Sequence, residues 1–205
     1  MDKEKKEKLK SDTREILDTI LFVVVFLILI RFFLFEIRWI PSESMVPTLI
    51  KQDRIVVSHI TNFFTEPKRG EVWVFYPPMT NIKKDPVSVF IRLTGLFCKD
   101  VAYIKRIVGM PGDKVEIKMQ ESGKYSVLIN DKELDEPYIK DAYDYIPCTY
   151  EINCGPFVVP EGEYFMMGDN RGNSQDSRFW GTLPKNRLIG RAVFLFWPLN
   201  RTKKL

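Results

Sequence analysis

The residue types that permit nucleophilic catalysis stand together at residues 40–49, IPSESMVPTL. Pro41 and Pro47 bracket Ser42 and Ser44, and the two prolines stiffen the backbone so that Ser44 is held on a tight turn. A serine hydroxyl becomes an effective nucleophile when a neighbouring base accepts its proton. Because serine and proline are also common in ordinary turns, the segment indicates a nucleophile only together with such a base.

Lys105 is the candidate base, and it lies in a segment with the pattern of a β-strand, YIKRIVGMPGD at residues 103–113. Alternation along a strand places Tyr103, Lys105 and Ile107 on one face. An apolar environment lowers the pKa of a lysine, so that the neutral amine is present near neutral pH. The alternative is a surface lysine whose stem crosses apolar surface while its ammonium reaches water.

A third segment, GDNRGNSQDSRFWG at residues 168–181, is too polar for a core strand. Its charged and amide side chains are able to cross-brace a loop through charge-assisted hydrogen bonds. These side chains are Asp169, Asn170, Arg171, Asp176 and Arg178. A solvated surface loop is the alternative interpretation.

Composition excludes several other kinds of site. The chain has 205 residues, a net charge of +4 and one histidine, His59, so a metal motif with two histidines is ruled out. The basic residues gather near the two ends, and no basic stripe marks a nucleic-acid surface. We therefore expect no metal, no cofactor and no nucleic-acid partner.

The three cysteines leave two alternatives open. Cys148 and Cys154 enclose five residues, a spacing that neither zinc motifs nor C-x-x-C redox motifs use. They form a small disulfide loop if the domain lies in an oxidising compartment, or they are two free cysteines. Cys98 has the character of a small buried apolar residue.

Short segments rich in β-branched and aromatic residues follow one another after residue 36, and turns with glycine or proline separate them. This pattern predicts a mainly β, antiparallel domain. The expected strands are at residues 54–58, 71–76, 102–108, 114–119, 124–129, 163–167 and 189–197. Residues 77–100 show no clean strand pattern.

The N-terminal part of the chain predicts a membrane anchor. Residues 16–35, ILDTILFVVVFLILIRFFLF, are apolar except for three positions, and twenty helical residues span about 30 Å, the thickness of the hydrocarbon core. A cleaved signal peptide is the alternative, but its apolar run is shorter and small residues follow it. We therefore expect one uncleaved transmembrane helix.

Basic residues before this helix set the expected orientation. Lys3, Lys5, Lys6, Lys8, Lys10 and Arg14 predict a cytoplasmic tail at residues 1–15 and a domain at residues 36–205 on the other side of the membrane. Disulfides persist on that side, which favours a bridge between Cys148 and Cys154.

Four segments in this order after an anchor resemble the boxes of bacterial type I signal peptidases, also called leader peptidases: IPSESMVPTL, KRGEVWVFYPP, YIKRIVGMPGD and GDNRGNSQDSRFWG. The resemblance implies an antiparallel signal-peptidase fold with a second β region inserted at about residues 114–163. It also implies a membrane-anchored serine endopeptidase that removes signal peptides from exported preproteins and cuts after small residues.

The resemblance also implies residue roles. Ser44 would be the nucleophile and Lys105 the general base, while Ser42 would assist the oxyanion hole and Ser174 would orient the lysine. Asp176 and Arg178 would brace the site. The residues that would line the substrate pockets are Ile40, Met45, Leu49, Tyr103 and Ile104.

The cysteine pair resembles one in periplasmic members of this family, which places the domain in the periplasm, outside an inner membrane. The expected partners are preproteins and membrane lipid, and the chain is expected to be monomeric. Three features depart from the family pattern: Gly172 replaces an aspartate, Glu43 replaces a small residue, and residues 77–100 are longer than usual. A peptidase dedicated to one precursor and a peptide-binding domain without activity are the alternatives.

Overall fold

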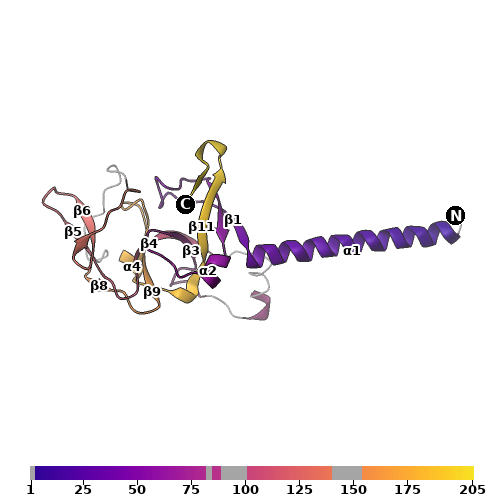
Figure 1. Ribbon diagram of the computed structural model, residues 1–205, viewed down its shortest axis with the longest axis horizontal. Helices are drawn as coiled ribbons and strands as arrows, with labels where there is room; N and C mark the ends of the chain where they lie inside the picture. Colours follow the sequence, from indigo (N-terminus) through magenta and orange to yellow (C-terminus); the bar gives the residue numbers. More distant parts are fainter. Residues whose placement is uncertain (1–2, 82–84, 89–100, 140–153) are drawn as a thin grey trace.

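The computed structural model describes residues 3–81, 85–88, 101–139 and 154–205. A long helix, α1 (Lys3–Phe33), projects from a β domain that begins directly after it (Figure 1). The sequence predicts a membrane-spanning helix at residues 16–35. Among the residues that the structure describes, no helix combines the length and the apolar character that crossing a membrane requires.

The larger of two sheets has eight strands in the order β1-β2-β11-β3-β4-β9-β10, with β12 paired to β11. Every strand pair in it is antiparallel. The strands are β1 (Phe35–Trp39), β2 (Arg54–Ser58), β3 (Val72–Phe75), β4 (Tyr103–Gly109), β9 (Glu163–Met167), β10 (Leu183–Pro184), β11 (Leu188–Trp197) and β12 (Lys203–Lys204). Valine, isoleucine and aromatic residues dominate them, as suits a pleated, half-buried surface.

The smaller sheet has four antiparallel strands in the order β7-β6-β5-β8. Its strands are β5 (Lys114–Met119), β6 (Tyr125–Ile129), β7 (Lys132–Glu133) and β8 (Phe157–Val158). The chain enters this sheet after β4 and leaves it before β9, and the sheet lies at the end of the domain away from α1 (Figure 1). The expected mainly β, antiparallel fold is confirmed.

Short helical segments complete the described fold. They are α2 (Ile60–Phe64), α4 (Ser177–Trp180) and two 3₁₀ helices, η1 (Lys185–Arg187) and η2 (Leu199–Arg201). In α4 the first turn is capped by Asp176, whose side chain accepts a hydrogen bond from the backbone N–H of Arg178.

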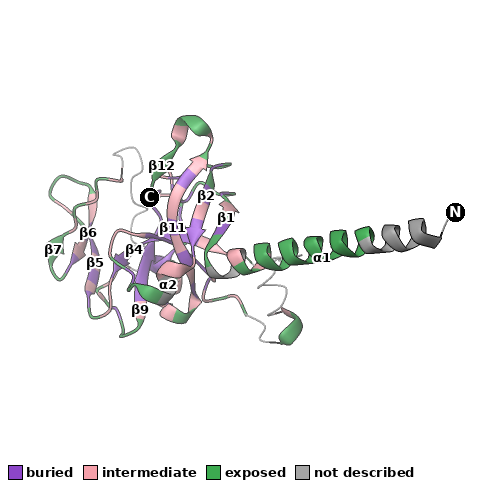
Figure 2. Cartoon of the chain, turned by 45° about the vertical axis from the view of Figure 1, so that its right-hand side comes forward, coloured by how far each residue is buried: buried purple, intermediate pink, exposed green. Residues whose placement is uncertain are grey.

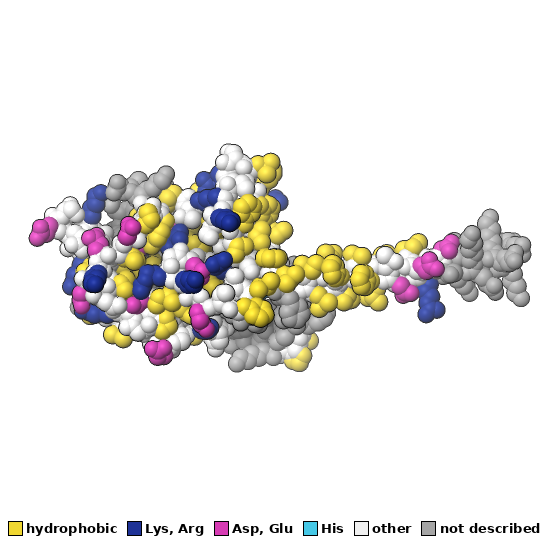
Figure 3. Space-filling model, in the orientation of Figure 1, with side chains coloured by type: hydrophobic (Ala, Val, Ile, Leu, Met, Phe, Trp, Pro, Cys, Tyr) yellow, Lys and Arg dark blue, Asp and Glu magenta, His cyan; other side chains and the backbone are white. Residues whose placement is uncertain are grey.

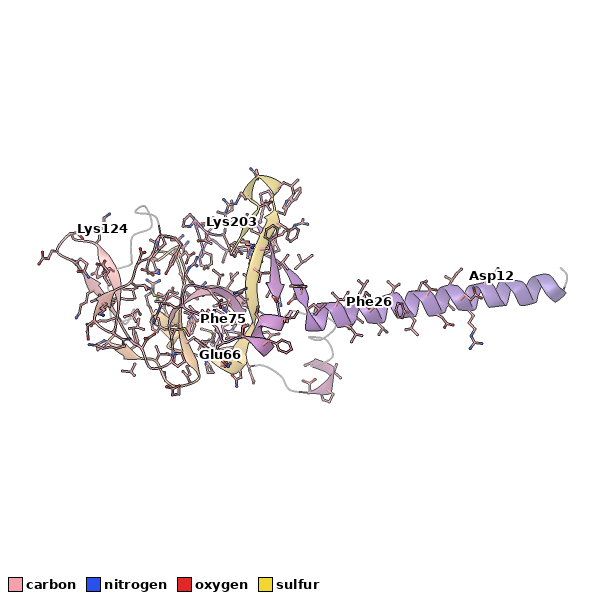
Figure 4. The ribbon with its side chains drawn as sticks, in the orientation of Figure 1. Asp12, Phe26, Glu66, Phe75, Lys124 and Lys203 are labelled. Carbon is pink, nitrogen blue, oxygen red and sulfur yellow. The ribbon has the colours of Figure 1, made fainter. Side chains whose placement is uncertain are left out.

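Successive side chains of β3 enter two different hydrophobic clusters, one on each face of the strand. Figure 2 shows that buried residues (purple) gather in the centre of the β domain. Val72 and Val74 of β3 join the cluster that also contains Ile104, whereas Trp73 and Phe75 join a cluster with Ile107. Phe75, the last residue of β3, is fully buried, and Figure 4 shows it inside the domain. Because β3 and β4 are covered on both faces, side chains that β4 carries have little access to water.

Candidate active site

The segment that carries Ser44 forms a turn pinned to the core. The Leu49 N–H donates to the Met45 carbonyl at 2.9 Å, and both side chains are fully buried in the cluster with Ile55. Ser44 itself is buried, while Ser42 and Glu43 before it are exposed. The stiff turn expected from the two prolines is therefore present, and its buried end places Ser44 against β4.

Lys105 reaches Ser44 from β4. Its Nζ lies 2.7 Å from Ser44 Oγ, and only 4% of the lysine is exposed. On the strand it pairs with Trp73, and its Nζ lies 5.6 Å from the ring centre of Tyr103. The alternation predicted for β4 thus places Lys105 on the face that its apolar neighbours cover.

Burial lowers the pKa of Lys105 from 10.5 to about 8, against the opposing attraction of Asp176 and Asp169. Arg178 lowers this pKa further by repulsion. With a pKa near 8, about one lysine in ten is neutral at pH 7. A neutral amine at hydrogen-bonding distance is able to accept the proton of the Ser44 hydroxyl.

Ser42 and Ser174 occupy different positions relative to this pair. Ser42 Oγ lies 3.4 Å from Ser44 Oγ on the exposed side of the turn. Ser174 is buried, and its Oγ lies where a Cβ at Gly168 would stand. No hydrogen bond of normal geometry from Ser174 Oγ is found in the part of the chain that the structure describes, so the structure does not join it to Lys105.

Asp176 and Arg178 form a buried bidentate ion pair, with Nε–Oδ1 and Nη2–Oδ2 distances of 2.8 and 2.9 Å. Asp176 Oδ2 also accepts the Gly168 N–H at 3.0 Å. Burial opposes ionisation of this carboxylate, but the hydrogen bonds and charge of Arg178 outweigh it and lower the pKa of Asp176. The pair therefore ties the loop after β9 to α4.

Two further ion pairs hold the same loop. Arg106 binds Asp169 with both Nε and Nη2, at 2.8 and 2.6 Å, and its guanidinium stacks on Tyr138. Arg171, which is fully buried, binds the Glu136 carboxylate with Nη1 and Nη2. The sequence indicated that Asp169 and Arg171 brace a loop, but it gave no sign of Arg106 or Glu136 as their partners.

The loop also contacts the turn that carries Ser44. The Asn170 N–H donates to the Ser44 carbonyl at 3.1 Å, and Asn170 Nδ2 donates to the Glu43 carbonyl at 3.1 Å. A Cβ at Gly168 would overlap Ser174 Oγ and would lie 2.5 Å from the Ser44 carbonyl oxygen. Only glycine therefore permits this close approach of the two segments.

A cleft of about 470 Å³ opens beside the two side chains, and a second hollow of about 260 Å³ adjoins it. Both are lined by Pro41 and by residues 101–104, while Ser42, Ser44 and Lys105 line the first. Of the expected pocket residues, Tyr103 and Ile104 line both hollows and Ile40 lines the second.

Met45 and Leu49, the other expected pocket residues, do not line either hollow. They lie in the hydrophobic cluster with Ile40 and Ile104, fully covered. Their contact with the two lining residues shows that they support the wall of the hollow from behind.

The start of β4 leaves one strand edge open at this cleft. On one side β3 pairs with β4 from Tyr103 onward, but on the other side β9 pairs only from Arg106 onward. Among the described residues, no strand covers the second edge at residues 101–105. An extended peptide is able to add to an edge of this kind.

Other predicted features fall partly outside the described residues. Cys148, Cys98 and most of residues 77–100 lie there, and Cys154 packs against the cluster between the two sheets. Within the described residues, no group of three or more histidine, cysteine or acidic side chains is arranged to hold a metal ion.

Comparisons with known proteins agree with these features. The family described as "Signal peptidase, peptidase S26" matches residues 13–197. A signal peptidase I of Leptolyngbya laminosa is 40% identical over 198 residues, 97% of this chain and 86% of the relative. The signal peptidase I S of Bacillus subtilis is 34% identical over 204 residues, 95% of each chain.

A solved structure was also found, a signal peptidase I of Enterococcus faecalis V583. It has a TM-score of 0.44 and 24% identity, and the match covers 63% of this chain and 98% of that one. The family assignment rests on the sequence relatives and the family match, which extend over most of the chain. The chain belongs to the signal peptidase family, peptidase S26.

Proposed function

We propose that Ser44 and Lys105 are the catalytic pair with which this chain removes signal peptides from preproteins. The observation that carries the proposal is the 2.7 Å contact between the buried Lys105 Nζ and Ser44 Oγ. Membership in the signal peptidase family makes the chain a serine endopeptidase for such substrates. The expected family and activity from the sequence are confirmed, whereas the residue roles remain proposals.

In the reaction, Ser44 Oγ attacks the scissile carbonyl carbon while its proton passes to Lys105 Nζ. The carbonyl oxygen becomes an oxyanion, which the Ser44 N–H and the Ser42 hydroxyl stabilise. Collapse of the intermediate breaks the C–N bond, and Lys105 returns the proton to the departing amine. Water then attacks the acyl-enzyme, giving up a proton to Lys105, and its collapse releases the acid and restores the Ser44 hydroxyl.

The bracing residues act on the charge of the lysine in opposite directions. Burial lowers the pKa of Lys105, Asp176 raises it, and Arg178, which is paired with Asp176, partly offsets that rise. Ser174 lies against Gly168, and the proposed role of its hydroxyl is to orient Lys105 Nζ.

Substrate recognition takes place at the open edge of β4. An extended peptide adding there would place alternate side chains against the wall that Ile40, Tyr103 and Ile104 form, with Met45 and Leu49 behind it. The preference for small side chains before the cut is part of the proposal that the family resemblance supports, and the hollow of about 260 Å³ adjoins the cleft where such side chains would lie.

Membrane attachment through residues 16–35 is part of the same proposal. Apolar side chains between Ile16 and Leu29 are exposed, with Leu21 and Phe22 63% and 69% exposed, and Figure 3 shows apolar side chains (yellow) on the part of α1 nearer the domain. A helix that is apolar all round is found inside a protein core or in lipid. The cytoplasmic tail and the periplasmic domain follow from the basic residues before the helix. Extraction of membranes with alkaline carbonate tests this, because an anchored chain stays in the pellet.

A disulfide between Cys148 and Cys154 is also proposed. Cys154 is disulfide-bonded, which supports the pairing, while Cys148 lies outside the described residues. Non-reducing peptide mapping of the periplasmic domain would identify the linked peptides directly. A monomeric state stays a prediction.

The decisive experiment uses the full chain in detergent with a preprotein, followed by N-terminal sequencing of the product. Ser44→Ala and Lys105→Arg should abolish cleavage, because one lacks the nucleophile and the other has a side chain that stays protonated. Ser122→Ala and Lys132→Arg are matched controls on exposed turns and strands of the smaller sheet, and they should cleave normally. Cleavage that survives in Ser44→Ala would refute the proposed nucleophile.

A further inference from the structure

Asn170 makes two hydrogen bonds to consecutive carbonyl groups on the turn that carries the nucleophile. Its backbone N–H donates to the Ser44 carbonyl, and its side-chain Nδ2 donates to the Glu43 carbonyl, both at 3.1 Å. Asn170 is 8% exposed, so water has little opportunity to replace these bonds. One residue of the last loop therefore contacts both peptide units that flank Ser44, and the Val46 N–H shares the Glu43 carbonyl with it at 3.2 Å.

The hydrogen bond from Asn170 Nδ2 to the Glu43 carbonyl also sets the direction of the Ser44 N–H. The Glu43 carbonyl and the Ser44 N–H belong to the same peptide unit, which is planar, and in a trans unit the two groups point in opposite directions. Holding the carbonyl on one side therefore aims the Ser44 N–H to the other side. Among the described residues, no acceptor is bonded to that N–H, so it is available to a ligand in the cleft.

Asn170 is itself held from both sides. The preceding residue, Asp169, is bound by Arg106 of β4, and the following residue, Arg171, is bound by Glu136, which follows β7 of the smaller sheet. The Asn173 N–H donates to the Asn170 carbonyl at 3.0 Å and closes the turn. The two buried ion pairs thus hold the backbone on both sides of Asn170. The charged residues of the loop therefore keep this neutral side chain in place.

We propose that Asn170 is a positioning residue for the oxyanion hole, because it orients the Glu43–Ser44 peptide so that the Ser44 N–H points at the developing oxyanion. The inference rests on the proposed function of Ser44. A hydrogen bond to the carbonyl also polarises the peptide and strengthens its N–H as a donor. The effect is confined to the transition state, since the oxyanion is absent from the bound substrate.

Asn170→Asp tests the inference, because aspartate has the same shape but lacks the Nδ2 donor and keeps the backbone N–H. Removal of an oxyanion donor reduces kcat by about 10²–10³-fold, and a misdirected donor should cost somewhat less, about 10–100-fold in kcat. KM should change by less than about twofold. Asn170→Ser removes the amide without adding charge, and it should show the same loss if the aspartate variant fails to fold.

Two readouts separate positioning from a merely structural role. A peptide aldehyde forms a hemiacetal with Ser44 whose oxygen occupies the oxyanion position, and its affinity should fall in parallel with kcat/KM in the Asn170 variants. In the uncharged Asn170→Ser variant the apparent pKa in the pH profile of kcat/KM should stay where it is in the wild-type enzyme, since Asn170 does not contact Lys105, whereas the new carboxylate of Asn170→Asp should raise it, as Asp169 does. Asn186→Asp adds the same charge on the exposed η1 turn and should leave all constants unchanged.

A double-mutant cycle with Ser42→Ala completes the test. If Ser42 and Asn170 act on the same oxyanion, the two losses in kcat should be non-additive. The inference is overturned if folded Asn170 variants keep wild-type kcat, or if they lose activity through KM alone. The proposed function is judged separately, by cleavage in the wild type and its loss in Ser44→Ala.

Discussion

Lys105 and Arg106 are neighbours in β4, yet they contact opposite sides of the site. Lys105 Nζ lies 2.7 Å from Ser44 Oγ, and Arg106 Nη2 lies 2.6 Å from Asp169 Oδ2. Because successive residues of a strand point to opposite faces, one strand both presents Lys105, the proposed base, and fixes the loop that holds the turn of Ser44. A small shift of β4 would therefore disturb both contacts at once.

Gly168→Ala should reduce kcat/KM by about 100-fold or more, because displacement of a reacting group by about 1 Å costs that much. The new Cβ would lie 2.5 Å from the Ser44 carbonyl oxygen and would push the two segments apart. Gly123→Ala, where no atom lies within 4 Å of the new Cβ but the backbone φ is +78°, is the control: it should cost some stability and leave kcat/KM unchanged. Normal turnover in folded Gly168→Ala would show that the loop need not approach the nucleophile.

Asp176→Asn should lower the free energy of unfolding by about 3–5 kcal/mol, because it leaves the buried Arg178 guanidinium without its counter-charge. The effect should depend on pH with a definite sign. The pKa of Asp176 is lowered below 3.8 in the folded state, so its contribution is present above about pH 4 and is lost as the pH falls through the folded pKa. Urea unfolding at pH 7 and at low pH measures the contribution of Asp176 to the free energy of unfolding.

The difference between wild type and Asp176→Asn should therefore shrink on acidification. Asp131→Asn is the matched control, since Asp131 is an exposed partner of Lys114 and its ion pair should contribute little. An Asp176 variant as stable as the wild type at pH 7 would contradict the bracing role.

His59→Ala should keep wild-type kcat/KM within about twofold, because Ser44 and Lys105 form the reacting pair without it. His59 Nδ1 lies 3.1 Å from the Ile189 carbonyl, Nε2 lies 3.4 Å from Glu36 Oε2, and the residue does not line the cleft. Loss of these contacts should cost about 1 kcal/mol of stability. Assays and thermal melts of the same preparation separate the two effects, and a folded but inactive variant would refute the Ser/Lys pair.

Substrates with Ala, Gly or Ser before the cut should be cleaved rapidly, and those with Leu or Phe poorly. A bulky side chain would meet the wall that Tyr103 and Ile104 form and would hold the scissile carbonyl away from Ser44, at a cost of about 100-fold per 1 Å. The comparison uses kcat/KM for peptides that differ at this one position. Equal values for Ala and Phe would mean that these hollows do not select the substrate.

The antiparallel β fold and the family were predictable because their signals are local. Proline around Ser44 and the alternation around Lys105 specify a turn and a strand without any knowledge of the rest of the chain. The 2.7 Å contact between the two residues is not local, since it depends on how the turn packs against β4. The pairing of Ser44 with Lys105 was predicted from the resemblance to a family, and not from the spacing of the two residues.

The parts that sequence reasoning missed are the long-range ones. Nothing in the sequence connects Arg106 to Asp169, or Glu136 to Arg171. Met45 and Leu49 were expected at the pocket surface, whereas the structure covers both with the core. An apolar residue next to a catalytic turn looks the same in sequence whether it touches substrate or supports the wall behind it.

The pH dependence of kcat/KM for the wild-type enzyme tests the account most directly. The base must be neutral in the free enzyme, and burial lowers the pKa of Lys105 to about 8. The account predicts that log kcat/KM rises with a slope of one at low pH, bends near pH 8 and is level above it. A profile that is flat through this range, or one whose bend disappears in His59→Ala, would show that Lys105 is not the base.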